Sequence, residues 1–207
     1  MTKKSRSVGN FPGYGTQIFF INDNSDIQIF REFNEVALIP NNERDLEIVD
    51  LLEENCDLSF CRDQSYEDFS FIALEHFCIF AVDSQGNVYG TIGNCGHIND
   101  REYPVGLVTK DGKCGKIAAF LKEFLELVNY YPYWKEIIEY ERQGIYYSTD
   151  QLEKKYNMHT KVYLEKQRRI EKELNLDKNS KSLDLLLSSL DDDDQFVVFD
   201  HRYENLL

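Results

Sequence analysis

The stretch of residues 77–92 constrains the fold of this chain more than any other. Residues 77–82 read Phe-Cys-Ile-Phe-Ala-Val, an almost unbroken apolar run that is typical of a strand buried on both faces. A second β-prone run follows at 88–92, and Gly86 and Asn87 between them tolerate the positive φ of a tight turn. The pattern predicts a β-hairpin in the interior of the fold.

Other local patterns extend this core into one domain. Strands are expected at 17–21, 69–74 and 105–109, and a last strand at 196–199 is expected to join the same sheet. Helices are expected from Asn42 onward, over 117–131, over 148–176 as one long charged helix, and over 183–190. Residues 1–16 are basic and then rich in Gly and Pro, so we expect a flexible arm followed by a single domain over 17–207.

Charge limits the partners that this chain can bind. It carries 23 Lys and Arg against 37 Asp and Glu, a formal net charge of −14. Such a chain is repelled by the phosphate backbone, so general nucleic-acid binding is not expected. The balance indicates either a basic partner or simple solubility. The excess lies in residues 21–75, with 15 acids and 3 bases, and in 191–207, with 6 acids and 1 base.

Two acidic segments are candidate contact surfaces for a basic partner. One is a run of four adjacent aspartates near the C-terminus, and the other is the acidic face of the first expected helix. Both have a plainer explanation, because the run can be a solvated loop that protects the last strand and the helix face can simply be solvated. The candidates are Asp191, Asp192, Asp193, Asp194, Glu43, Asp45, Glu47, Asp50, Glu53 and Glu54.

Motifs that would indicate an enzyme are missing from the sequence. No P-loop, GxGxxG after a strand, GxSxG or HExxH occurs, so we expect no catalytic residue, cofactor or metal. Asp83 and Asp111 are interpreted as turn residues, and Cys95 with His97 as ordinary loop residues rather than metal ligands. The five cysteines are odd in number and form no CxxC, so all are expected to be reduced thiols.

The cellular location is predicted from the absence of membrane-spanning and secretory signals in the sequence. No apolar run reaches the roughly 18–20 residues that a membrane helix needs. Lys3, Lys4 and Arg6 are not followed by an apolar stretch, so no secretory signal is expected. We therefore expect a cytoplasmic protein that does not contact membranes, either as a monomer or as a weak homodimer.

The order of several motifs resembles a known family. The hairpin 79–89, the segment 104–108, the pair Gly112 and Gly115, the helical run 120–127 and the Tyr-Pro-Tyr-Trp run at 131–134 resemble the SUKH superfamily of Smi/Knr-like proteins. The resemblance is clearest over 69–134. It implies an α+β fold with a mixed, mostly antiparallel sheet and helices packed around it.

The resemblance also implies a function. Bacterial members of the superfamily are mostly immunity proteins that bind and neutralise protein toxins, often nucleases, and fungal members are regulatory scaffolds. The leading hypothesis is therefore a non-catalytic immunity protein, or antitoxin, that occludes the active or substrate-binding surface of a cognate toxin. The alternative is a regulatory scaffold of the Smi/Knr type, and an enzyme of an unrecognised type ranks last.

Overall fold

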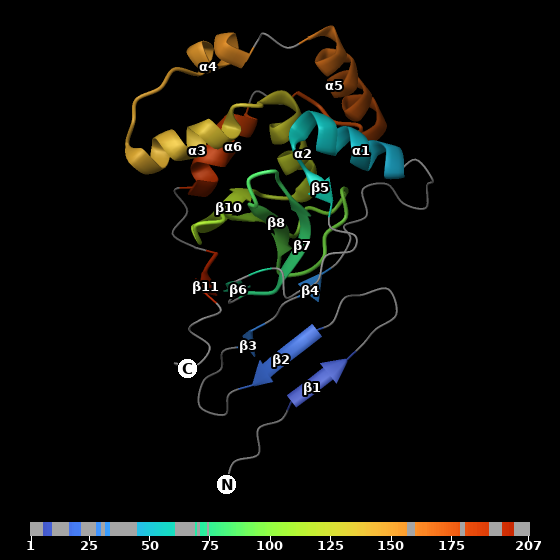
Figure 1. The fold of residues 1–207 in the computed structure, drawn as a ribbon, viewed down its shortest axis with the longest axis vertical. Helices are drawn as coiled ribbons and strands as arrows, with labels where there is room; N and C mark the ends of the chain where they lie inside the picture. The colour runs from blue at the N-terminus through green and yellow to red at the C-terminus, as the bar shows by residue number, and fades with distance from the viewer. Residues whose placement is uncertain are drawn as a thin grey trace.

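A five-stranded path through one sheet forms the centre of the fold (Figure 1). The computed structural model describes residues 6–9, 17–21, 28–29, 32–33, 45–60, 69, 71–73, 75–156, 160–178, 181–190 and 196–200. The strand order is β10-β9-β8-β7-β4, and β5 also pairs with β7. These strands are β4 Glu32–Phe33, β5 Ser59–Phe60, β7 Phe77–Val82, β8 Val88–Ile92, β9 Val105–Val108 and β10 Cys114–Ala118.

The sheet is mixed and mostly antiparallel. All its pairings are antiparallel except that of β4 with β7. β7 and β8 form the predicted hairpin, with Val82 opposite Val88 and Gly86 at a φ of 83°. The expected α+β class is therefore confirmed.

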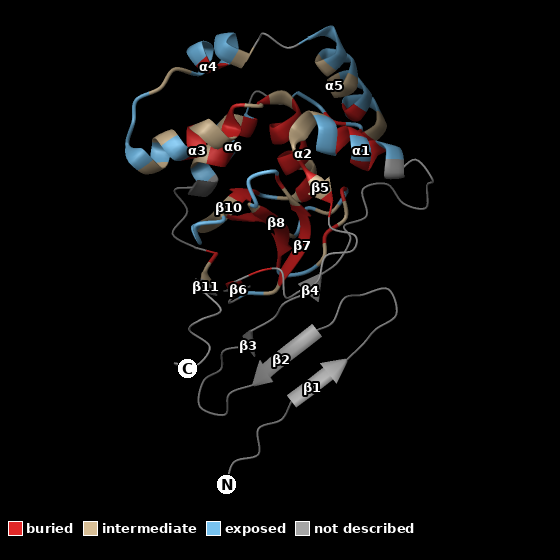
Figure 2. Cartoon of the chain, viewed as in Figure 1, coloured by how far each residue is buried: buried red, intermediate tan, exposed pale blue. Residues whose placement is uncertain are grey.

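Six helices in the described part of the chain complete the domain. They are α1 Asp45–Cys56, α2 Leu121–Tyr130, α3 Trp134–Gln143, α4 Thr149–Tyr156, α5 Lys161–Leu174 and α6 Ser182–Leu190. Figure 1 shows them gathered at one side of the sheet. Figure 2 shows that α2 is buried over most of its length, whereas α1 and α3 carry both buried and exposed residues. α2 therefore lies inside the helical layer, and α1 and α3 present their exposed residues to solvent.

Successive sheet residues face two different hydrophobic cores. Phe80, Tyr89 and Leu107 pack in the core that the sheet shares with the helices, whereas Phe77 and Val88 pack in a second core that includes Phe196. The Phe77 and Phe196 rings lie 4.7 Å apart. A strand that lies between two cores must be apolar at nearly every position, which explains the unbroken run at 77–82.

Two smaller sheets lie outside the central one. β6 Phe71–Ala73 pairs antiparallel with β11 Val198–Asp200. β1 Arg6–Gly9, β2 Gln17–Ile21 and β3 Gln28–Ile29 form a three-stranded sheet in that order. The expected strand at 17–21 is thus confirmed, and residues 6–9 of the expected arm form a strand. The flexibility of the rest of 1–16 stays a prediction.

Three sequence predictions about elements are wrong in detail. Ile117 lies on β10, and the following helix begins at Leu121. The long helix expected over 148–176 is two helices, because Thr160 has extended backbone (φ −64°, ψ 159°) and its side chain caps α5 by accepting a hydrogen bond from the Tyr163 backbone N–H. The last strand pairs with β6 rather than joining the central sheet.

Cys78 and Cys95 form a disulfide, so the prediction of five reduced thiols is wrong for these two. The bond joins β7 to the connection between β8 and β9 and closes a loop over 17 positions of sequence. Cys56 and Cys114 are free thiols, and Cys61 lies outside the described residues, so its reduced state stays a prediction. Disulfides persist in oxidising compartments and are rare in the cytosol. The expected cytoplasmic location therefore stays a prediction, and this disulfide counts against it.

Substitution of Gly90 by Ala is expected to destabilise the sheet. A Cβ at this position would lie 2.7 Å from two ring carbons of Phe77 and 2.8 Å from the Cys78 carbonyl oxygen. Overpacking of this kind typically lowers the free energy of unfolding by about 1–3 kcal/mol, which urea unfolding measures. The control is Gly115→Ala on β10, where the added Cβ meets nothing within 4 Å. Equal midpoints for the two variants would contradict the packing described here.

Candidate partner-binding surface

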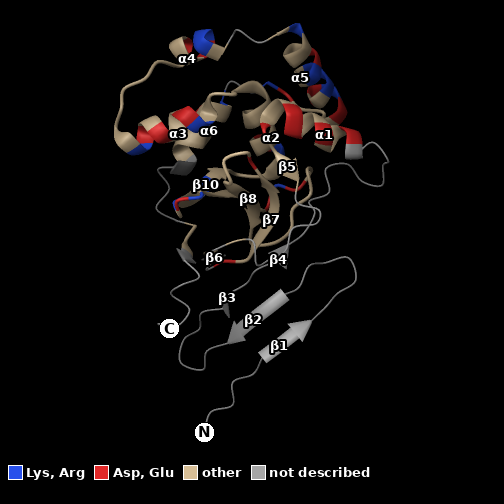
Figure 3. Cartoon of the chain, in the orientation of Figure 1, with Lys and Arg blue, Asp and Glu red and all other residues tan. Residues whose placement is uncertain are grey.

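Helix α1 is amphipathic, with an acidic outward face. It buries Ile48, Leu51 and Leu52 in the core shared with the sheet. Its exposed residues include four acids, and its 12 residues contain no Lys or Arg. Figure 3 shows these acids along α1 beside a more basic α5. A helix that buries one face and exposes a row of carboxylates on the other can bind a basic surface.

The structure brings together only part of the predicted acidic set. Glu47, Asp50, Glu53 and Glu54 are exposed along α1, and Asp45 is the first residue of that helix. Glu43 and the run Asp191 to Asp194 lie outside the described residues. Their proposed role as contact residues stays a prediction.

Two of the acids on α1 are already engaged by α5. Arg169 pairs with Glu47, and Lys166 pairs with Glu54. Both carboxylates are still more than half exposed, at 60% and 58% of their side-chain surface. Pairs this exposed contribute little to stability, typically 0–1 kcal/mol. Buried apolar residues of the two helices, such as Leu52 and Ile170, hold α1 and α5 on the same core. Among the described residues, no ion pair involves Asp50 or Glu53, so these two carboxylates face solvent.

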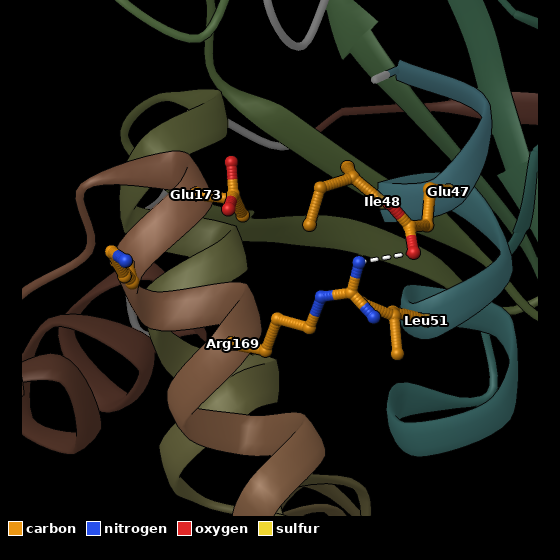
Figure 4. A pocket seen from close by; sticks show the side chains of 6 residues that line it. Glu47, Ile48, Leu51, Arg169 and Glu173 are labelled. Atoms are coloured by element: carbon orange, nitrogen blue, oxygen red, sulfur yellow. Dashed lines mark ion pairs between the residues drawn. The ribbon is translucent and has the colours of Figure 1, made fainter.

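A pocket of about 320 Å³ lies between α1 and α5 (Figure 4). The Arg169–Glu47 ion pair spans it, and the side chain of Ile48 lies beside that pair. The lining residues are Glu47, Ile48, Leu51, Arg169, Lys172 and Glu173. The two acids and two bases balance in charge, and the set contains no Ser, Thr, Cys or His. The pocket therefore presents charged groups that can form hydrogen bonds and ion pairs.

A buried carboxylate, Asp83, joins the β7–β8 hairpin to α3. Its Oδ1 accepts hydrogen bonds from the backbone N–H groups of Gln85 and Asn87, as expected for a turn aspartate. Its Oδ2 accepts from the Tyr89 hydroxyl at 2.8 Å and from Lys135 Nζ on α3 at 2.6 Å. The Asp83 side chain is fully buried, so this cluster holds the hairpin to α3.

Lys135 extends the cluster to the end of α1. Its Nζ lies 3.3 Å from Asp57 Oδ2, in the residue that follows α1. Asp57 has a left-handed φ of 56°, and its carboxylate also accepts hydrogen bonds from the backbone and side chain of Ser84. The hairpin turn, α3 and the end of α1 are therefore held by one charged network.

The network also sets the protonation of its members. Burial raises the pKa of Asp83, but hydrogen bonds from Lys135 and Asn87 outweigh it and hold that pKa below its ordinary value. Burial, and then the neighbouring Asp83 charge, raise the pKa of Tyr89. The carboxylate is thus ionised and the phenol protonated at neutral pH. Both groups are occupied by structural hydrogen bonds.

Sequence reasoning missed Lys135 as the partner of Asp83. The signal that was available is its place directly after Trp134, in a stretch whose apolar residues are buried. A lysine in such a stretch needs a carboxylate nearby, because an unpaired buried charge is unfavourable. The partner lies 52 positions away in sequence and could not be chosen from the pattern alone.

The free thiol at the end of α1 is not activated. Burial raises the pKa of Cys56 to about 12, and the positive charge of Lys135 offsets this only in part. A thiol with such a pKa stays protonated at neutral pH and is a poor nucleophile. Cys56 is therefore a packing residue beside the core.

Comparison with known proteins leaves the geometry as the guide to function. No family model, no curated protein and no solved structure matches this chain. No helix among the described residues is long and apolar enough to cross a membrane. Within the same residues, no group of three or more His, Cys, Asp or Glu side chains could hold a metal ion. Cys95 and His97 are residue types that can bind a metal, but Cys95 is bonded to Cys78.

Proposed function

We propose that this chain is an immunity protein that binds a basic protein toxin domain, such as a nuclease, and occludes its active or substrate-binding surface. The observation that carries the proposal is the outward face of α1, where carboxylates stand on a helix fixed at both ends. The net charge of −14 and the resemblance to Smi/Knr-like proteins support it. Binding alone produces the effect, so no turnover is involved.

Electrostatic attraction raises the rate at which such an inhibitor associates with its target. A nuclease presents Lys and Arg to its phosphate substrate, and an acidic inhibitor approaches the same surface. Complementary charge raises association rate constants from about 10⁵–10⁶ M⁻¹s⁻¹ toward 10⁸–10⁹ M⁻¹s⁻¹ at low salt. The helix needs little reordering, because Ile48, Leu51 and Leu52 already hold it on the core. Charges fixed before the encounter lose less conformational entropy on binding.

The test begins by finding the partner. The wild-type chain is used to select binders from a displayed library of catalytically inactivated bacterial toxin domains, washed at low and at moderate salt. We expect a basic domain whose binding weakens as salt rises. Selection of no toxin domain, or only of acidic or neutral ones, would contradict the proposed function. Selection of regulatory proteins from a matched whole-genome library would favour the scaffold alternative.

The double variant Asp50→Asn with Glu53→Gln tests the role of α1. We expect the association rate constant for the selected domain to fall about 3–10-fold and its salt dependence to flatten, with little change in dissociation. Stopped-flow fluorescence at several salt concentrations measures both. The charge-matched control is Glu165→Gln with Asp184→Asn, two exposed acids on α5 and α6. If the control slows association equally, net charge rather than the α1 face explains the rate.

A further inference from the structure

The segment 144–148 joins α3 to α4 at the outer edge of the helical layer (Figure 1). Figure 2 shows it running along the periphery with exposed residues. Its sequence is Gly-Ile-Tyr-Tyr-Ser. Tyr146 is 95% exposed and Ile145 is 45% exposed, the first being the most exposed large apolar side chain of the described residues. Two adjacent exposed apolar side chains have no role in the core.

Backbone hydrogen bonds order both ends of this segment. Gly144 ends α3 with a left-handed φ of 63°, and the Ile145 N–H donates to the Tyr140 carbonyl at 2.9 Å. At the other end, the Ser148 carbonyl accepts from the N–H groups of Gln151 and Leu152 in the first turn of α4. The segment is thus tied to both helices.

Tyr147 fixes the middle of the segment. Its ring stacks on Tyr140 with centroids 5.7 Å apart, and its hydroxyl donates to Glu141 Oε1 at 2.7 Å. The chain is therefore held on either side of Tyr146, whose ring projects into solvent. A rigid exposed aromatic of this kind loses little entropy on binding, and Tyr is enriched among the residues that dominate protein interfaces.

The charges around the segment define the partner. Residues 139–153 contain four acids, Glu139, Glu141, Asp150 and Glu153, and one base, Arg142. Lys154 and Lys155 follow at the end of α4, and with them the stretch keeps a net charge of −1, a small acidic excess that favours a basic surface over an acidic one. The matching partner surface is an apolar recess large enough for a phenol ring, surrounded by Lys and Arg.

We propose that Tyr146, supported by Ile145, is the apolar anchor by which this chain holds its basic protein partner. The inference rests on the proposed function and names a second contact with the same toxin domain. Figure 1 places α1 and the segment at opposite edges of the helical layer, so the two contacts would lie at separate places on the partner. The roles differ, because the α1 carboxylates speed association whereas Tyr146 slows dissociation.

The test measures binding of the selected toxin domain to single variants. Tyr146→Ala should raise the dissociation constant at least 10-fold, mainly through faster dissociation, and Ile145→Ala should raise it about 3–10-fold. Tyr146 is 95% exposed, so Tyr146→Ala should leave the thermal unfolding unchanged. The control is Val162→Ala on α5, which removes an apolar side chain that is 58% exposed and should leave affinity within twofold.

A second pair of variants tests whether the fixed backbone matters. Tyr147→Phe keeps the stacking on Tyr140 and should bind nearly as the wild type, whereas Tyr147→Ala frees the segment and should weaken binding about 3–10-fold. If Tyr146→Ala and the wild type bind the selected domain equally, the anchor is overturned while the proposed function stands. If the wild type selects no basic domain, both proposals fail together.

Discussion

Substitution of Asp83 by Asn should lower the free energy of unfolding by about 2–4 kcal/mol. The variant keeps the shape of the side chain and the oxygen that accepts from the turn. It replaces the Oδ2 that Tyr89 and Lys135 contact by an amide donor. Lys135 then faces a donor and loses a fully buried counter-charge, while its second partner, Asp57, is 46% exposed. Equilibrium urea unfolding at pH 7 measures the loss.

The stabilisation that Asp83 provides should be lost at low pH and retained at neutral pH. Its pKa is lower in the folded protein than its ordinary value, so the ionised group stabilises the fold at any pH above that ordinary value of about 3.9. This stabilisation is lost as the pH falls through the folded pKa. The difference between wild type and Asp83→Asn should therefore be constant from pH 5 to 7 and shrink below about pH 4.

The matched control for Asp83 is Asp111→Asn. Asp111 occupies the turn of the β9–β10 hairpin, but its side chain is 61% exposed and pairs with Lys113 at the surface. We expect a much smaller loss of stability there, because solvent screens such pairs. A loss for Asp83→Asn no larger than that for Asp111→Asn would show that the buried network does not stabilise the fold.

Removal of the Cys78–Cys95 disulfide should lower the free energy of unfolding about as much as Asp83→Asn does. The bond spans 17 positions of sequence, and closing a loop of this length stabilises a protein by about 3 kcal/mol through the entropy of the unfolded chain. For a chain of this size, Cys95→Ser should then lower the melting temperature by about 6–12 °C under non-reducing conditions. Differential scanning calorimetry measures the shift.

The disulfide can also be checked chemically. Alkylation of the denatured, unreduced protein followed by mass spectrometry should label Cys56, Cys114 and the remaining cysteine, Cys61, and recover the peptides of Cys78 and Cys95 joined. The control for stability is Cys114→Ser, which alters a free and partly exposed thiol. Labelling of Cys78 and Cys95 without reduction would contradict the bond. So would a melting temperature for Cys95→Ser equal to that of the wild type.

Local patterns predicted the elements whose signals lie within a few residues. The apolar run 77–82 and the Gly86 turn gave the hairpin, and the acidic amphipathic pattern gave α1. The same kind of pattern failed at Ile117, because its spacing from Phe120 fits a helix while the residue belongs to the second strand of a hairpin. Thr160 was missed because the charged pattern continues unchanged through the break between α4 and α5.

Features that depend on distant residues could not be predicted this way. Lys135 meets Asp83, and Cys95 meets Cys78, only after the sheet and α3 are in place. The same holds for Glu47 and Glu54, whose contacts with Arg169 and Lys166 join helices more than 100 positions apart. Charge on α1 was visible in the sequence. Which acids face outward was not, because that depends on where α5 packs.

The residues of α1 have separate structural roles, and this separation has an evolutionary consequence. Ile48, Leu51 and Leu52 hold the helix on the core, and Glu47 and Glu54 contact α5. Asp50 and Glu53 do neither, so substitutions at these two positions leave folding intact. A lineage can therefore exchange one partner for another by drifting at surface sites that selection for stability does not constrain. Relatives of this protein should differ most at those two positions and least at the three that are buried.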